Sequence, residues 1–420
     1  MKSFALLMFA ALPLAAGTDD SFLLRGVTVH TVSGQDLPNG SILVQDGKIM
    51  GVGVKLSAPK GIRIIEGKSM HVYPGMIDSA SEVGMIEIDS IKETTDLTEL
   101  GDFNPQLRTA VAVNPSSDHI PVTRANGITA VMNLPRGGMI AGQGSLMHLD
   151  GWTWEEMEIL RSGTMHINFP VLTPAPSRFG DSRRIPFVEV KREYEAKLRS
   201  LHDFFEQCRR YQKAKAAALA GFQTDLKYEA MLPVLERKLP VLITAIRERT
   251  VHDAVEFAAQ EHIRIILADV REPGQMLPEL KTKGIPVVLG KTLELPLNDD
   301  DPYDASSSLP AQLYRAGVKF AFATFSASFS RNLPYQAANA VAFGLPYAEA
   351  LKAVTLNAAE IWGVGEKMGS IDEGKWADLM ITDGDPLEAK TQIKQLFIKG
   401  KPVDLENKHH QLYEKYLNRP

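Results

Sequence analysis

Short runs rich in Val, Ile, Leu and Phe alternate with stretches of helical periodicity between about residues 73 and 365. Strands that alternate with helices imply βα units and a parallel sheet. Seven runs fit buried strands: residues 72–78, 127–133, 165–172, 239–245, 263–270, 285–290 and 318–325. An eighth would complete a TIM-like (β/α)8 barrel, and we place it at residues 213–225, where no clear strand pattern is visible. The charged segment 188–215 predicts a long helix with a solvated face.

Both ends of the chain have a different pattern, with short alternating strands separated by turns. Asp46-Gly47 is a strong hairpin signal in the first of these regions. We therefore expect a small composite β-sandwich built from both ends of the mature chain. The predicted organisation is a signal peptide at 1–17, β-sandwich at 18–72 and 366–405, the barrel at 73–365, and a C-terminal tail at 406–420.

The first residues have the pattern of a secretory signal peptide. Lys2 precedes an apolar run that ends in small residues, and we expect cleavage near Ala16 or Gly17. This run is too short for a membrane span. An uncleaved anchor and a buried N-terminal helix are the alternatives. We therefore predict a periplasmic or secreted protein without a membrane-spanning segment.

Composition excludes few classes of function, but two of its features are informative. The net charge is −5 at pH 7, and no basic stripe carries interleaved aromatic residues, which argues against a nucleic-acid surface. Cys208 is the only cysteine, so neither an intramolecular disulfide nor a thiolate zinc cluster is expected. Its helical context favours a structural thiol.

Several separate motifs point to one family. Residues 74–78 read Pro-Gly-Met-Ile-Asp, and residues 369–379 contain the string G-x-x-x-x-G-K-x-A-D-L. Further matches are Asn104-Pro105, Asn114-Pro115 and residues 140–151. In these motifs the chain resembles the amidohydrolase superfamily, in particular its imidazolonepropionase-like branch. The resemblance covers almost the whole mature chain and implies the barrel and the split sandwich.

The resemblance also implies a metal site at the carboxyl ends of the barrel strands. In active relatives one or two divalent ions, usually zinc, make hydroxide from bound water and polarise the scissile carbonyl. The ligands are a His-x-His on the first strand, a carboxylate or carboxylated lysine on a middle strand, and histidines on the fifth and sixth. An aspartate on the eighth strand acts as the base.

This chain departs from that pattern at each position that we can assign. Serines replace both histidines of the first strand, and no confident lysine or glutamate stands on the middle strand. The six positions of the degenerate site are Ser79, Ser81, Thr244, Ile246, Asp269 and Phe325. Only Asp269, which stands at the sixth-strand histidine give or take one residue, is a strong oxygen donor. We therefore expect no metal or other cofactor and assign no catalytic residue.

Replacement chemistry has weak support in the sequence. His119 and His166 could face the barrel mouth, but hydrogen-bonded structural histidines are the simpler interpretation. A serine nucleophile at Ser79 or Ser81 would need a base such as His119 or Asp269, and no G-x-S-x-G elbow is present.

Three functions remain open. The first is an exported, non-catalytic amidohydrolase-like protein that acts as a partner or scaffold subunit of an active relative. The second is a hydrolase that cleaves carbon–nitrogen bonds through an unconventional site. The third is a small-molecule binding protein that uses the barrel mouth, which Phe325 would make more apolar. A homo-oligomer, or a hetero-oligomer with an active relative, is expected.

Overall fold

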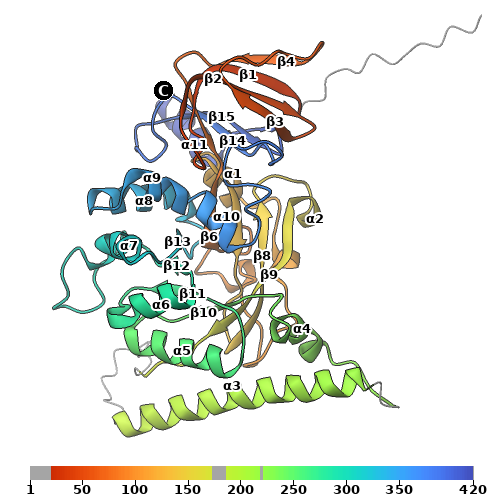
Figure 1. The fold of residues 1–420 in the computed structure, drawn as a ribbon, viewed down its shortest axis with the longest axis vertical. Coiled ribbons are helices and arrows are strands. Elements are labelled where there is room, and N and C mark those ends of the chain that lie inside the picture. Colours follow the sequence, from red (N-terminus) through yellow and green to blue (C-terminus); the bar gives the residue numbers. More distant parts are fainter. Residues whose placement is uncertain (1–19, 173–185, 218–220, 420) are drawn as a thin grey trace, which may run out of the picture.

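The computed structural model describes residues 20–172, 186–217 and 221–419. The predicted signal peptide at 1–17 lies outside these residues. Two eight-stranded sheets dominate the fold, one forming a nearly closed barrel and the other a smaller β domain next to it (Figure 1). The predicted fold class, a barrel with a composite β domain, is confirmed.

The barrel sheet contains eight strands in consecutive order, and the seven predicted apolar runs each contribute one of them. The strands are β6 (Met76–Ser81), β7 (Ile128–Asn133), β8 (Ile140–His148), β9 (Glu158–Asn168), β10 (Val241–Thr244), β11 (Ile265–Val270), β12 (Val287–Leu289) and β13 (Phe320–Phe322). Beyond the end of β13, Phe325 N donates to Ala80 O at 2.8 Å and brings the last strand against the first.

The predicted position of the eighth strand is wrong. The beginning of segment 213–225 completes helix α3 (Phe187–Ala216), as its alanine-rich composition favours. The additional strand is β8, which pairs antiparallel with both β7 and β9. Only residues 134–139 connect β7 to β8, too few for the crossover that a parallel pair requires.

The apolar run at 72–78, predicted as one strand, is two. Residues His71–Pro74 form β5, which pairs with β14 of the β domain, and the barrel strand β6 begins at Met76. Gly75 separates them. A Cβ atom at this position would lie 2.2 Å from Thr129 Oγ1 on the neighbouring strand, so the close approach requires glycine.

The β domain joins the two ends of the chain in one sheet. Its order is β16-β15-β14-β5-β1-β2-β3, with β4 paired to β1. The strands are β1 (Phe22–Val29), β2 (Leu37–Gln45), β3 (Lys48–Gly53), β4 (Arg63–Glu66), β5 (His71–Pro74), β14 (Leu379–Thr382), β15 (Ile393–Ile398) and β16 (Lys401–Val403). Phe22 and Phe397, from opposite ends of the sequence, pack together in its core with ring centroids 4.6 Å apart.

The helices surround the barrel and extend beyond it (Figure 1). They are α1 (His119–Arg124), α2 (Trp154–Met157), α3 (Phe187–Ala216), α4 (Leu226–Leu235), α5 (Glu248–Gln260), α6 (Leu277–Lys283), α7 (Ala305–Ala316), α8 (Leu333–Ala342), α9 (Tyr347–Ala353), α10 (Leu356–Ile361) and α11 (Lys408–Leu417). The predicted long helix is α3, which packs on α5 through Phe205 and Phe257 and lies at the end of the molecule away from the β domain. No helix among the described residues is both long and apolar enough to cross a membrane.

Candidate functional site at the barrel mouth

The barrel mouth comprises the side chains at the carboxyl ends of the parallel strands, where barrel enzymes place their active sites. At the end of β6 the two predicted serines have different surroundings. Ser79 is fully buried, and its Oγ has no hydrogen-bond partner among the described residues. Ser81 Oγ donates to Ser326 O at 3.3 Å. Among the described residues, neither hydroxyl forms a hydrogen bond with an imidazole or a carboxylate.

Asp78, which precedes these serines, links the first and last strands. Its carboxylate accepts hydrogen bonds from Thr324 N at 3.0 Å, Thr324 Oγ1 at 2.5 Å and Ser330 Oγ at 2.7 Å. Complete burial raises the pKa of Asp78 to about 6, although these hydrogen bonds act in the opposite direction. The carboxylate is thus enclosed by protein donors and serves to close the barrel.

Thr244, at the end of β10, is bound to a histidine that the sequence placed on a strand. His166 Nε2 lies 2.9 Å from Thr244 Oγ1, and His166 Nδ1 lies 2.8 Å from Pro135 O. Because a carbonyl only accepts, Nδ1 carries the proton and Nε2 accepts from the threonine hydroxyl. Burial lowers the pKa of His166, which keeps the imidazole neutral. Both ring nitrogens are therefore engaged.

The next predicted position, Ile246, forms hydrogen bonds at the mouth through its backbone carbonyl. Its carbonyl accepts from Arg271 N and Glu272 N, both at 3.0 Å, and so fixes the loop after β11. The other histidine considered above, His119, lies with Nε2 3.1 Å from Glu87 O, as expected for a structural histidine.

Asp269, near the end of β11, is paired with a cation of its own chain. Arg271 Nε lies 3.0 Å from Asp269 Oδ1, and Arg271 Nη1 lies 2.6 Å from Glu294 Oε2. Lys291 Nζ completes this group at 3.0 Å from Glu294 Oε1. Burial raises the pKa of Asp269, and the charge of Arg271 opposes the increase. We call Asp269, Arg271, Lys291 and Glu294 the ion-pair cluster.

The backbone around this cluster is adapted to it. Asp269 itself has a φ of +53°, which is uncommon for a residue other than glycine. A Cβ at Gly290 would lie 2.2 Å from Asp269 Oδ1, so the end of β12 must be glycine for the carboxylate to fit. The position of Asp269 thus depends on neighbouring strands as well as on Arg271.

Glu82, one residue beyond β6, is a second buried carboxylate at the mouth. It forms an ion pair with Arg136, from the loop after β7, and its side chain is only 8% exposed. Burial raises the pKa of Glu82 to about 7, against the opposing effect of Arg136. Sequence reasoning missed Glu82, Arg136, Arg271, Lys291 and Glu294. For Glu82 and Arg271 the available signal was a charged residue directly after a strand end.

Phe325, at the position of the base, adds an apolar ring to the mouth. Its side chain packs against the apolar residues that fill the barrel interior, including Ala80 and Ala323. Its φ is +48°, and its amide is fixed by the bond to Ala80 O. A phenyl ring can neither accept a proton nor bind a metal.

The six predicted positions do not offer the donor set that a catalytic divalent ion takes. Zinc in such sites is bound by imidazole and carboxylate ligands with one position open. Here the positions supply two hydroxyls on β6, a threonine already bound to His166, an aliphatic and an aromatic side chain, and Asp269 paired with Arg271. The residues present therefore do not fit the metal that the resemblance implies.

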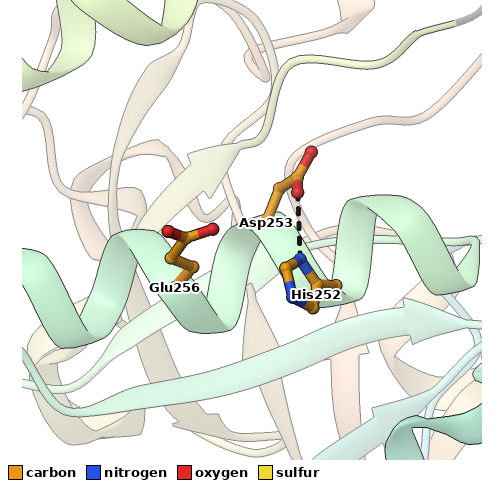
Figure 2. Close-up of side chains that lie close together, drawn as sticks. All are labelled: His252, Asp253 and Glu256. Carbon is orange, nitrogen blue, oxygen red and sulfur yellow. Dashed lines mark hydrogen bonds and ion pairs between the residues drawn. The ribbon is translucent and has the colours of Figure 1, made fainter.

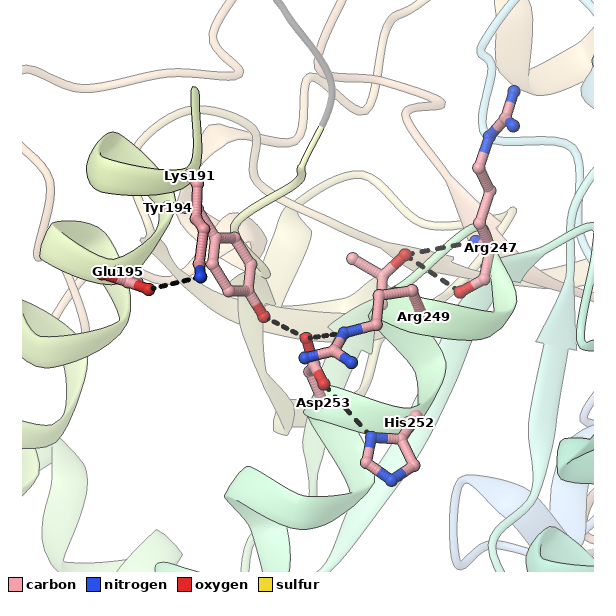
Figure 3. Close-up of polar contacts among 8 residues, drawn as sticks. Lys191, Tyr194, Glu195, Arg247, Arg249, His252 and Asp253 are labelled. Atoms are coloured by element: carbon pink, nitrogen blue, oxygen red, sulfur yellow. Dashed lines mark hydrogen bonds and ion pairs between the residues drawn. The ribbon is translucent and has the colours of Figure 1, made fainter. Parts of the chain in front are cut away.

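One group of three possible ligands occurs elsewhere in the described part of the chain. His252, Asp253 and Glu256 lie on α5, outside the barrel, with one ligand atom from each within 4.8 Å of the others (Figure 2). Figure 3 shows that the carboxylate of Asp253 is already occupied. It accepts from Tyr194 at 2.5 Å and from Arg249 at 3.0 Å. The contact with Tyr194 joins α3 to α5, and the adjacent Arg249 cation disfavours a metal ion.

The same two helices enclose a cleft of about 560 Å³. Leu198 and Phe257 supply apolar lining, while Lys191 and Glu256 contribute charges of opposite sign. Its lining contains none of the six predicted residues.

Known proteins share both sequence and fold with this chain. A family model described as "Amidohydrolase family" matches residues 303–403. The amidohydrolase tasK of Hapsidospora irregularis is 22% identical over 405 residues, which are 88% of this chain and 41% of tasK. The chain thus spans about two-fifths of that relative.

Among solved structures, an amidohydrolase from Thermotoga maritima MSB8 has a TM-score of 0.76 and 25% identity, over 91% of this chain and 99% of that one. Phenylurea hydrolase B has a TM-score of 0.56 and 14% identity, over 92% of this chain and 97% of that one. At this identity the similarity shows the fold alone. Taken with the barrel and the β domain, these matches identify the chain as a member of the amidohydrolase superfamily.

Proposed function

We propose that this chain is an amidohydrolase-fold protein that has lost the metal centre and acts as a non-catalytic partner of a metal-bearing relative. The observation that carries the proposal is the ion-pair cluster. The carboxylate of Asp269 is neutralised by Arg271 and not left free for a dication. A cation held by the protein in this place would repel a divalent ion and occupy its ligand.

The surface around the mouth supports a role in association. Six large apolar side chains are exposed on the loops that follow β6, β12 and β13, which are neighbours around the barrel. We call them the apolar rim: Ile88, Ile91, Leu100, Leu293, Leu295 and Phe329. Leu100 and Leu295 are 96% and 86% exposed. Apolar groups gathered at one end of a protein are typical of an interaction surface.

The curated relative is consistent with pairing. The greater part of tasK lies outside the match, so that protein has room for a second unit of this size. In our proposal the corresponding second unit is a separate chain. The signal-peptide pattern at residues 1–17 further leads us to propose export, which would place the partner in the same compartment.

Co-expression with a tagged, metal-bearing amidohydrolase from the same cell tests the proposal. We expect a stable complex by size-exclusion chromatography with light scattering, in which the partner carries the metal and the activity. Leu295→Asp should weaken the complex by introducing a charge at the rim. Tyr413→Asp is the matched control, since Tyr413 is 63% exposed but lies on α11. Hydrolysis of dipeptides or amides by the purified single chain would contradict the proposal.

A hydrolase with an unconventional site is the second candidate, and Glu82 favours it. A carboxyl group with a pKa near 7 is suited to general acid–base catalysis. Glu82→Gln distinguishes the two functions. Under the alternative it would abolish an activity of the isolated chain, whereas under our proposal it would leave the activity of the complex unchanged.

A further inference from the structure

Two histidines of the β domain lie in direct contact, away from the barrel mouth. His30 follows β1, and His71 begins the adjacent strand β5. His30 Nε2 lies 3.0 Å from His71 Nδ1, while His30 Nδ1 lies 2.7 Å from Asp36 Oδ2. The His30 side chain is 14% exposed, whereas that of Asp36 is 56% exposed.

The protonation pattern follows from these contacts. Asp36 accepts a hydrogen bond from His30 Nδ1–H, so in neutral His30 the Nε2 atom is an acceptor. His71 Nδ1 must then donate. One further proton can be added at His71 Nε2 without disturbing the bond. A second would have to be added at His30 Nε2 and would place two N–H groups face to face.

The pair is connected to the barrel through a stack of rings. The His30 ring lies on Tyr73, with centroids 4.1 Å apart and planes within 3°. Tyr73 hydrogen-bonds with Tyr347, the first residue of α9, and Tyr347 OH donates to Asp385 at 2.9 Å. β1 and β5 of the β domain, α9 of the barrel and the loop after β14 therefore meet at this point.

We propose that His30 and His71 form a proton-gated contact that holds the β domain against α9 at neutral pH and opens when both imidazoles are protonated. The ionisable groups that face the pair are Asp36, Asp385, Tyr73 and Tyr347. Asp36 and Asp385 favour a proton on His30, whereas the like charge of His71 opposes it. The proton at His30 Nε2 is the one that breaks the contact.

Burial lowers the pKa of His30, and Asp36 only partly opposes this effect. Stability that depends on neutral His30 is therefore fully present above the ordinary imidazole pKa of about 6.5 and is lost as the pH falls below it. The contact should thus open in mildly acidic solution.

Hydrogen exchange of the full chain at pH 7.5 and pH 5.0, corrected for intrinsic rates, tests the proposal. We expect exchange in peptides covering β1, β5 and the start of α9 to increase by up to about tenfold for each pH unit below the pKa of His30. His71→Asn should abolish the increase, because its amide can donate to neutral His30 or accept from protonated His30. His252→Asn, at a half-exposed histidine on α5, should retain it.

An equal increase in the wild type and in His71→Asn would overturn the proposal, as would no increase in the wild type. If the variant fails to fold, side-chain ¹H–¹⁵N spectra of the wild type decide instead. They should show His30 protonated at Nδ1 alone at pH 7.5 and titrating below the ordinary imidazole range. A His30 that titrates at or above that range would contradict the proton-gated contact.

Discussion

The guanidinium of Arg271 lies 3.0 Å from the carboxylate of Asp269 at the mouth of the barrel. Asp269 is the one carboxylate among the six positions where the resemblance implies ligands and a base. Arg271 also bridges to Glu294, so a single cation holds together the loops after β11 and β12. The carboxylates of Asp269 and Glu294 thus balance the charges of Arg271 and Lys291.

Removal of this cation should destabilise the barrel. Arg271 is 21% exposed, and Arg271→Ala would leave Asp269 and Glu294 without their shared partner. We expect a loss of about 2 kcal/mol in the free energy of unfolding, below the full value for a deeply buried pair because water reaches the site. Urea denaturation measures this difference.

Arg210→Ala provides the matched control. Arg210 pairs with Glu206 on the exposed surface of α3, with a side chain 72% exposed. Its removal should change the free energy of unfolding by less than about 0.5 kcal/mol. Equal effects of the two substitutions would show that the ion-pair cluster has no special importance.

Gly290→Ala tests the position of Asp269 from the opposite side. The new Cβ would lie 2.2 Å from Asp269 Oδ1, so the carboxylate must move from Arg271 or the end of β12 must shift. A loss of about 1–3 kcal/mol is expected from such overpacking. Gly53→Ala, where the nearest atom lies at 3.5 Å, should be tolerated. A fully stable Gly290→Ala protein would contradict the packing described above.

The stability of the barrel should also depend on pH through Asp78 and Glu82. Their folded-state pKa values are raised to about 6 and about 7, above the unfolded values near 4. A raised carboxyl pKa gives stability that is present at low pH and is lost as the pH rises through the folded value. The contribution of these two groups should therefore decrease between about pH 4 and pH 7.

Glu82→Gln isolates part of this dependence, because the amide does not titrate. Denaturation curves at pH 5, 6, 7 and 8 should show a flatter profile for the variant than for the wild type in the range that includes pH 7. The proton-gated contact at His30 acts in the opposite direction, since its stability is lost on acidification. If the two profiles had the same slope, the raised pKa of Glu82 would be refuted.

Thr244→Val examines the hydrogen bond that occupies His166. Valine preserves the shape of the side chain but removes the hydroxyl, which leaves the buried Nε2 atom of His166 without its 2.9 Å partner. An unsatisfied buried acceptor costs about 1–3 kcal/mol. Thermal unfolding measures the loss, and an unchanged midpoint would mean that water replaces the hydroxyl.

Sequence pattern was sufficient for most of the fold. The apolar runs predicted where the strands lie, because strands buried on both faces of a parallel sheet are almost continuously apolar. The glycine-containing strand β8 was missed, since residues 140–148 have no clear strand pattern and periodicity does not give strand direction. The apolar run at 72–78 is divided into β5 and β6 at Gly75, where the backbone lies close to Thr129.

The candidate site was less accessible from sequence. Single positions such as Ser79 and Phe325 could be compared with a family pattern one by one. The ion-pair cluster could not, because Lys291 and Glu294 come from the loop after β12 and meet Arg271, from the loop after β11, only when adjacent strands align. Glu82 was overlooked because its burial and its contact with Arg136 depend on the loop after β7.

The metal content of the purified chain tests whether the barrel mouth has lost its metal centre. The protein should be expressed with zinc, manganese or iron in the medium, purified without chelator and analysed by inductively coupled plasma mass spectrometry, alone and after dissociation from a metal-bearing partner. We expect well under one equivalent of any transition metal per chain. One or two tightly bound equivalents, lost together with a hydrolytic activity on treatment with chelator, would contradict it.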